Sequence, residues 1–216
     1  MVYKALEIIS FNESVLKKSV AVIGNSQSLF NQNYGAMIDS HDIVIRFNKA
    51  APIYCDYDVS KTHGKKFDFW MFWTIGAFYN RFIQTADASD KIKSLFYSDY
   101  PFKIQAAING HKELTEKYIS NTCPIIYFQE LRKTIRVKNE TLQPSAGLVL
   151  LNWLNYCEPK RISVFGMDFK KTPTFSELDK FEQDMKNGID TRCNHDYDLE
   201  QEWFEKNMSH KVILYT

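Results

Sequence analysis

Two short apolar runs near the start of the chain are each followed by polar side chains that could bind a nucleotide. The run from Val20 to Ile23 leads, after one glycine, into Asn25 and Ser26, and the run from Ile43 to Phe47 leads into Asn48. An asparagine amide both donates and accepts hydrogen bonds, which suits phosphate oxygens as well as sugar and base edges. The carboxyl ends of parallel strands share one edge of a sheet, so we expect these side chains to line a crevice there.

Two further stretches are typical of a helix start and could hold an anionic group. Gly24 closes the first apolar run, and Ser26 or Ser28 behind it could accept from the first free N–H groups of a following helix. Ser145 comes between a proline and a strongly apolar stretch, and Gly147 would let a ligand approach the backbone closely. Free N–H groups at a helix N-terminus favour phosphate. Alternatively, Ser145 and Gly147 act only as a helix cap and a packing glycine.

A third group of residues could supply acid–base chemistry. His195 stands at the start of a predicted helix, where it could act as a general base or only as part of the helix cap. Glu200 lies slightly off the same helical face, and we expect it to orient the loop rather than to react. Asp168 and Lys170 follow another apolar run. They could contact a sugar hydroxyl and a departing phosphate, or be solvated.

Short apolar runs that alternate with helical stretches position these residues. The alternation predicts an α/β fold, a single Rossmann-like domain over residues 1–216 with a mostly parallel sheet flanked by helices. A helix is expected to follow the first strand directly. The strands are expected at 20–23, 43–47, 67–73, 95–97, 124–128, 162–165 and 212–215, and the further helices at 3–18, 76–90, 105–120, 148–156 and from 195–196 to about 207.

The composition excludes several classes of protein. The chain has 216 residues, of which 44% are hydrophobic, so it can bury a sizeable core. A formal net charge of +1 argues against a nucleic-acid-binding protein that relies on a basic field. No window is apolar enough for a membrane span, so we expect a cytoplasmic protein, with peripheral association at the inner face of the membrane left open. The four cysteines show no metal-ligand spacing.

Three stretches resemble the sialyl motifs of glycosyltransferase family 29, the CMP-sialic-acid-dependent sialyltransferases. Residues 20–50 contain GNSxxL and then GxxIDxHDxVIRFNxA, similar to the large motif. Residues 142–169 resemble the small motif, PSTGLLxL followed by a cysteine and VxxYGF, with Ala146 in place of the usual threonine. His195 and Glu200 match the HxxxxE of the very small motif.

The resemblance implies a sialyltransferase-like fold of the GT-A-variant type and a short bacterial or viral-type enzyme of surface-polysaccharide biosynthesis. It implies an inverting, metal-independent transfer of sialic acid from CMP-sialic acid to a glycan acceptor hydroxyl, with no further cofactor. The chain lacks a metal-binding DxD motif within the matched stretches; residues 56–58 have that spacing but lie in a polar loop. His195 would be the general base. Nucleotide contacts would come from Asn25, Ser26, Asn48, Ser145 and Gly147, with Gly24, Asp168, Lys170 and Glu200 in support.

The chain departs from the family pattern in two places. Cys157 stands at the position of one motif cysteine, but Val20 replaces its disulfide partner, which suits a reducing compartment. Nothing between Gly166 and Cys193 reproduces the family's His and Tyr cluster, which helps the leaving phosphate. Lys170 and its neighbouring lysine could supply the missing positive charge.

Three alternatives stay open. The donor could be another CMP-activated ulosonic acid such as Kdo, because the nucleotide is shared and the keto acid is similar. The chain could also be a non-catalytic nucleotide- or glycan-binding relative. A Rossmann-like methyltransferase or dehydrogenase is disfavoured, because GxGxxG is incomplete and Asn48 stands where an acidic residue would end the second strand.

Overall fold

The computed structural model describes residues 11–47, 58–73, 103–107, 121–122, 144–169, 171–172 and 195–216. The helix expected at 76–90 and the strands expected at 95–97 and 124–128 lie outside these residues. Two of the expected site residues, Asn48 and Lys170, lie outside them as well.

A seven-stranded sheet forms the centre of the described part, in the order β5–β4–β3–β2–β1–β6–β7, and neighbouring strands are parallel throughout. The chain runs outward from β1 to β5 and then returns to place β6 and β7 on the other side of β1. Where the strand order reverses, a crevice opens at the carboxyl ends of the strands. Here that point lies between β1 and β6. The strands are β1 (Ser19–Ile23), β2 (Ile43–Phe47), β3 (Phe69–Trp73), β4 (Lys103–Ala107), β5 (Asn121–Thr122), β6 (Arg161–Phe165) and β7 (Val212–Tyr215).

Strand β1 is apolar along its length because both of its faces are buried. Successive side chains of a strand point to opposite faces. Val20 and Val22 therefore join the core on one side of the sheet, and Ala21 and Ile23 join the core on the other. A central strand of a parallel sheet is expected to be a continuous apolar run for this reason.

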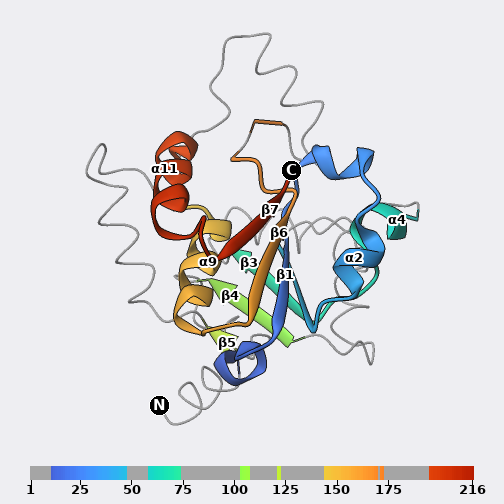
Figure 1. Ribbon diagram of the computed structural model, residues 1–216, viewed down its shortest axis with the longest axis horizontal. Helices are drawn as coiled ribbons and strands as arrows, with labels where there is room; N and C mark the ends of the chain where they lie inside the picture. The colour runs from blue at the N-terminus through green and yellow to red at the C-terminus, as the bar shows by residue number, and fades with distance from the viewer. Residues whose placement is uncertain are drawn as a thin grey trace, which may run out of the picture.

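Helices cover both faces of the sheet (Figure 1). On one side lie α9 (Ala146–Tyr156) and α11 (Tyr197–Asn207), and on the other α2 (Gly35–Asp39) and α4 (Ser60–His63). Helix α9 is the most deeply covered of them, since residues 148–154 are all buried. Its Trp153 donates a hydrogen bond of 3.0 Å from Nε1 to Oδ1 of Asn12, in the helical residues 11–15. The expected α/β fold with a parallel sheet flanked by helices is confirmed.

Two local expectations differ from the structure. The crossover from β1 to β2 is not one helix but a 3₁₀ helix, η1 (Gln27–Asn31), followed by the short α2. The helix expected at 105–120 is wrong at its start, because residues 103–107 form β4 beside β3. Gln105, Ala106 and Ala107 favour a helix in isolation, but pairing within a sheet overrides such a preference.

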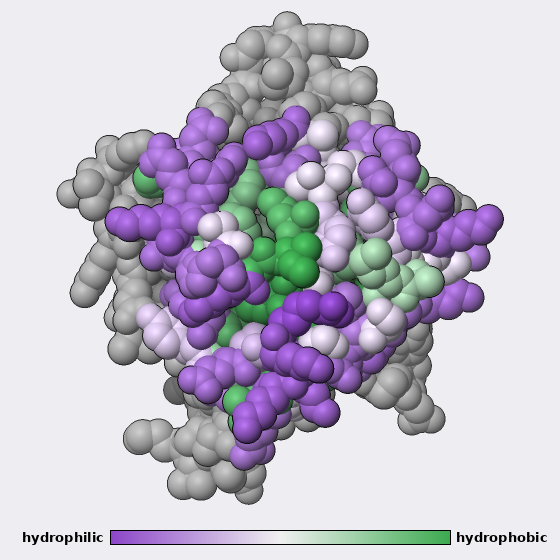
Figure 2. Space-filling model, viewed as in Figure 1, coloured by the Kyte–Doolittle hydropathy of each residue, from purple (hydrophilic) through white to green (hydrophobic). Residues whose placement is uncertain are grey.

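The described surface is mostly polar, with an apolar strip over the position of β7 (Figure 2). Ile213 and Leu214 of that strand are 46% and 37% exposed. No helix in the described ranges is both long and apolar enough to cross a membrane.

Candidate active site

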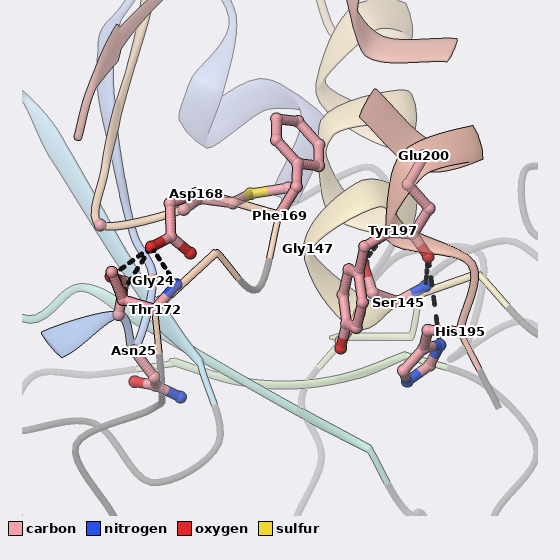
Figure 3. Close-up of a pocket in the computed structure, with 14 residues that line it drawn as sticks. Gly24, Asn25, Ser145, Gly147, Asp168, Phe169, Thr172, His195, Tyr197 and Glu200 are labelled. Atoms are coloured by element: carbon pink, nitrogen blue, oxygen red, sulfur yellow. Dashed lines mark hydrogen bonds and ion pairs between the residues drawn. The ribbon is translucent and has the colours of Figure 1, made fainter. Parts of the chain in front are cut away.

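A pocket opens at the carboxyl ends of β1 and β6, where the strand order reverses. Figure 3 shows its side chains in two groups that face each other. One group comes from the loops after β1 and β6, and the other from the starts of α9 and α11. The first group includes Asn25, Asp168 and Thr172, and the second Ser145, His195, Tyr197 and Glu200.

The loops after β1 and β6 meet backbone to backbone. Gly24 N–H donates to the carbonyl of Phe165 at 2.7 Å, and Ser26 N–H donates to the carbonyl of Gly166 at 3.0 Å. A Cβ on Gly24 would lie 2.1 Å from the Gly166 oxygen. Gly166 itself has a φ of +62°, in the region that favours glycine. Gly24 is therefore required for the close approach of the two loops, whereas the sequence analysis gave it only a supporting role toward the nucleotide.

Side-chain bonds reinforce this junction. Oδ2 of Asp168 accepts from Ser26 Oγ at 3.0 Å, from Thr172 N–H at 3.0 Å and from Thr172 Oγ1 at 2.5 Å. Ser26 Oγ also lies 2.6 Å from Thr172 Oγ1 and accepts from Ser28 N–H at 3.1 Å. Ser26 and Asp168 are both buried. The network fixes the loop after β1 against the loop after β6, and thereby one wall of the pocket.

The opposite wall is built around the N-terminus of α9. Ser145 caps this helix, since its Oγ accepts from Leu148 N–H at 3.3 Å. Its own two donors are bound to Glu200: the N–H reaches Oε1 and the hydroxyl reaches Oε2, both at 2.6 Å. The next N–H groups, those of Ala146 and Gly147, have no hydrogen-bond partner among the described residues. These two N–H groups, rather than the donors of Ser145, are the ones that α9 leaves available to an anion.

Gly147 leaves a space that a neighbouring side chain borders. A Cβ on Gly147 would lie 3.1 Å from both Cε and Sδ of Met167, in the loop after β6. The space beside this glycine is thus bounded by the tip of a flexible methionine.

Glu200 is fully buried in the first turn of α11. Burial raises the pKa of its carboxyl to about 7, although the two hydrogen bonds from Ser145 oppose the rise. The Asp196 carboxylate, at the N-cap of the same helix, pushes the pKa in the same direction as burial. A carboxyl group with a pKa near neutrality inside a pocket is typical of a functional site.

His195 stands one residue before the N-cap of α11. Its Nδ1 lies 4.0 Å from Oε1 of Glu200, and its side chain is 31% exposed. The ring of Tyr197 lies 5.5 Å from the imidazole, centre to centre, and tilts against it by 58°. Figure 3 shows the second ring nitrogen on the side away from Glu200. A partly exposed imidazole near a buried carboxyl group could act as a general base.

The pocket brings together every expected site residue that the structure describes: Gly24, Asn25, Ser26, Ser145, Gly147, Asp168, His195 and Glu200. Their roles toward a nucleotide stay predictions. Sequence reasoning missed Met167, Phe169, Thr172 and Tyr197, which also line the pocket. Tyr197 could have been found from its place two residues after His195, whereas no pattern in the sequence distinguishes Thr172.

In the described ranges, no group of three or more His, Cys, Asp or Glu side chains could hold a metal ion.

Comparison with protein families gives one decisive match. The model of glycosyltransferase family 29 (sialyltransferase) matches residues 8–212. The chain belongs to this family. It is a sialyltransferase-family glycosyltransferase, as the three motifs indicated. No curated protein matches the sequence significantly.

Solved structures of several sialyltransferases are similar in fold to this chain. The Campylobacter jejuni α-2,3-sialyltransferase Cst-I superposes with a TM-score of 0.59 at 16% identity, over 93% of this chain and 75% of the relative. A mammalian sialyltransferase in complex with Gal-β-1-3GalNAc-ortho-nitrophenol gives 0.55 at 15% identity, over 92% and 69%. The Campylobacter jejuni sialyltransferase CstII in complex with the substrate analogue cytidine-5′-monophosphate gives 0.53 at 17% identity, over 93% and 79%.

Proposed function

We propose that this family 29 member transfers sialic acid from CMP-sialic acid to a hydroxyl group of a glycan, with inversion at the anomeric carbon and His195 as general base. The observation that carries the proposal is the convergence of two features in one pocket. These are the N–H groups of Ala146 and Gly147, which no described residue binds, and the imidazole of His195.

The start of α9 suits the leaving group. As the bond between the sugar and CMP breaks, negative charge develops on the phosphate. Two N–H groups at the N-terminus of an eleven-residue helix stabilise such charge, both directly and through the helix dipole. The amide of Asn25, across the pocket, can donate to the phosphate or to the ribose. Asn48 and Lys170 stay predicted contacts of the same nucleotide.

His195 suits the attacking alcohol. In a direct displacement the acceptor oxygen bonds to the anomeric carbon while CMP departs from the opposite face, which inverts that carbon. The hydroxyl proton moves to the imidazole in the same step. Base assistance of this kind typically contributes 10²–10⁴-fold to the rate. The acceptor is expected to be a glycan, and a galactoside is a suitable first candidate because one mammalian relative was solved with Gal-β-1-3GalNAc.

Helix N–H groups can balance the single phosphate of CMP, so we propose that the reaction needs no metal ion. The expectation is tested by transfer in the presence of EDTA.

Cys157, which takes the place of a disulfide cysteine in secreted relatives, is a free buried thiol. Burial raises the pKa of this thiol to about 12. A thiol held in this state supports the proposal that the enzyme works in the reducing cytoplasm, at the inner face of the membrane where its glycan is assembled.

The first experiment is a thermal-shift screen with CMP, CDP, UMP, UDP and NAD. Ligand stabilisation follows RT ln(1 + [L]/Kd), so stabilisation by CMP is expected to exceed that by the others. CMP release is then measured with CMP-sialic acid and with CMP-Kdo, each with a galactoside acceptor. Faster turnover of CMP-Kdo than of CMP-sialic acid would show that CMP-Kdo is the donor. Stabilisation by NAD alone would contradict the proposal that the protein uses a CMP-sugar.

The second experiment tests the base. His195→Gln is expected to lower kcat by about 10²–10⁴-fold with CMP affinity unchanged. His210→Gln, at an exposed position just after the same helix, is the matched control and keeps full activity. Binding of CMP without transfer in the unmodified protein would identify a non-catalytic relative instead. Unchanged turnover in His195→Gln would remove this residue from the mechanism.

A further inference from the structure

One buried carboxyl group lies next to both the start of α9 and the proposed general base. Glu200 is fully buried and binds the N–H and the hydroxyl of Ser145 at 2.6 Å each, while its Oε1 lies 4.0 Å from Nδ1 of His195. We propose that Glu200 is a positioning residue that holds the start of α9 and the imidazole of His195 in one arrangement, with the imidazole proton on Nδ1. The inference rests on the proposed function in that it gives this arrangement a role in transfer.

Helix capping does not account for Glu200. Ser145 already caps α9 through Leu148 N–H, and Asp196 already caps α11 by accepting from Leu199 N–H at 2.9 Å. A buried carboxylate is costly unless it is well hydrogen-bonded, and an uncharged side chain would fill the same space at lower cost. Its position between two helices that are capped without it therefore points to a task other than stability.

The contact with His195 decides which nitrogen can act as a base. A carboxylate favours the N–H on the ring nitrogen that faces it, which here is Nδ1. The lone pair is then on Nε2, on the side away from Glu200 (Figure 3). When Nε2 takes the proton of an acceptor hydroxyl, the ring becomes an imidazolium and the carboxylate stabilises it. Glu200 itself exchanges no proton in this step.

The contact with Ser145 links the same carboxylate to the phosphate side. By fixing the backbone of Ser145, Glu200 sets the direction of the next two N–H groups, which are those proposed to meet the phosphate. A shift of this carboxylate would therefore displace the base and the phosphate donors together.

Charged groups on both elements act on Glu200. On α11 the Asp196 carboxylate opposes its ionisation, and His195 favours it when protonated. From α9 the two donors of Ser145 favour it. Burial outweighs these donors and holds the pKa of Glu200 at about 7. Activity on the acid side of neutrality should therefore require the loss of two protons, one from Glu200 and one from His195.

The decisive test is ¹⁵N NMR of the imidazoles in the ligand-free protein, in which the signal of His195 among the five histidines is identified by its loss in His195→Gln. The Nδ1–H tautomer is the minor form of free histidine, so its predominance at His195 is diagnostic. In Glu200→Gln the pKa of His195 is expected to fall and its Nε2–H form to grow. An Nε2–H tautomer in the unmodified protein, or the same tautomer and pKa in Glu200→Gln, would overturn the inference whether or not the protein transfers sugar.

Kinetics give the second readout. Glu200→Gln is expected to lower kcat about 10–100-fold, to shift the acid limb of the kcat profile to lower pH and to reduce its slope from nearly two to one. Ser145→Ala keeps the carboxylate but removes one donor, so the acid limb should shift to higher pH. Glu205→Gln, an exposed position on the same helix, is the matched control with an unchanged profile. If the acid limbs of the kcat profiles of Glu200→Gln and Ser145→Ala shifted in the same direction, the role of Glu200 would be purely structural. An Nδ1–H tautomer without transfer of any CMP-sugar would instead count against the proposed function alone.

Discussion

Gly24 and Gly166 lie so close that a single methyl group on Gly24 would sit 2.1 Å from the carbonyl oxygen of Gly166. Gly24→Ala must therefore push the loops after β1 and β6 apart. We expect a loss of about 1–3 kcal/mol in the free energy of unfolding, together with weaker CMP binding. Urea denaturation and calorimetry measure the two effects.

The control for this substitution is Gly147→Ala. Its new methyl group would meet only the tip of Met167, at 3.1 Å, and a methionine end can move aside. The loss of stability should be clearly smaller than in Gly24→Ala. Equal losses in the two variants would contradict the assignment of Gly24 to the junction between loops.

The substitution Ala146→Pro tests whether the backbone N–H of residue 146 binds the phosphate, without disturbing the fold. Ala146 is the first residue of α9, where proline fits a helix, and Ser145 before it has the extended backbone that a proline requires (φ −66°, ψ 155°). Ala146→Pro deletes one N–H donor with little change in stability. We expect CMP affinity to fall about 10–100-fold, as for a lost hydrogen bond to a charged group. Cytidine, which has no phosphate, should bind Ala146→Pro and the unmodified protein equally well. A parallel loss of cytidine binding would show that the variant distorts the pocket.

The hydrogen bonds of Asp168 predict a loss of stability when its side chain is replaced. Asp168→Leu keeps a similar shape but leaves no oxygen that could accept from Thr172 or Ser26. We expect a cost of about 1–3 kcal/mol in the free energy of unfolding. Thr172→Ser keeps both donors and should behave nearly as the unmodified protein, whereas Thr172→Val should lose part of the same energy. Full stability in Asp168→Leu would contradict the proposal that this network holds the wall of the pocket in place. Thermal unfolding of the four proteins makes the comparison.

Two buried groups give opposite dependences of stability on pH. Burial and then the charge of Arg46 lower the pKa of His63 to about 4, so protonation of the unfolded chain costs stability as the pH falls from 6.5 to 4. Glu200 has a pKa raised to about 7, so ionisation of the unfolded chain costs stability as the pH rises from 4.5 to 7. Each shift corresponds to about 3 kcal/mol at its limit.

The two dependences are separated by substitution. In Glu200→Gln, stability should rise with pH between 4.5 and 6.5, relative to the unmodified protein. In His63→Gln it should fall with pH over the same interval. All other titrating groups are common to both variants. The difference between their curves of unfolding free energy against pH therefore reports only Glu200 and His63. Urea denaturation at half-unit pH steps measures it, and parallel curves would contradict both assignments.

The strands that the sequence predicted well are those whose residues form a nearly continuous apolar run. For β2 and β7 the expected limits 43–47 and 212–215 agree with the structure, and β1 and β6 each begin one residue earlier than expected. A continuous apolar run bounded by polar residues is sufficient to locate such a strand. β4 was not predictable in this way, because its Gln105 and two alanines have no strand pattern and its place depends on β3.

The site residues were predictable as separate groups but their contacts were not. Motifs indicated His195, Glu200 and Ser145, yet the bond between the last two joins positions 55 residues apart. It depends on how α11 meets the start of α9, which no local pattern encodes. The contact of Asp168 with Ser26 spans 142 residues and follows from the reversal of strand order at β1. Local sequence thus identified the chemical groups, and tertiary packing decided which of them share hydrogen bonds.

The central position of β1 also constrains the order in which the protein can assemble. β1 is translated before the rest of the described sheet, but its second neighbour, β6, pairs Ser19 with Arg161 and Ile23 with Phe165. A nascent chain on the ribosome therefore leaves one edge of β1 unpaired until residues 161–165 have emerged. Because the loop after β6 forms one wall of the pocket, a chain released before β6 has emerged would present a hydrophobic strand to chaperones and proteases and would lack that wall.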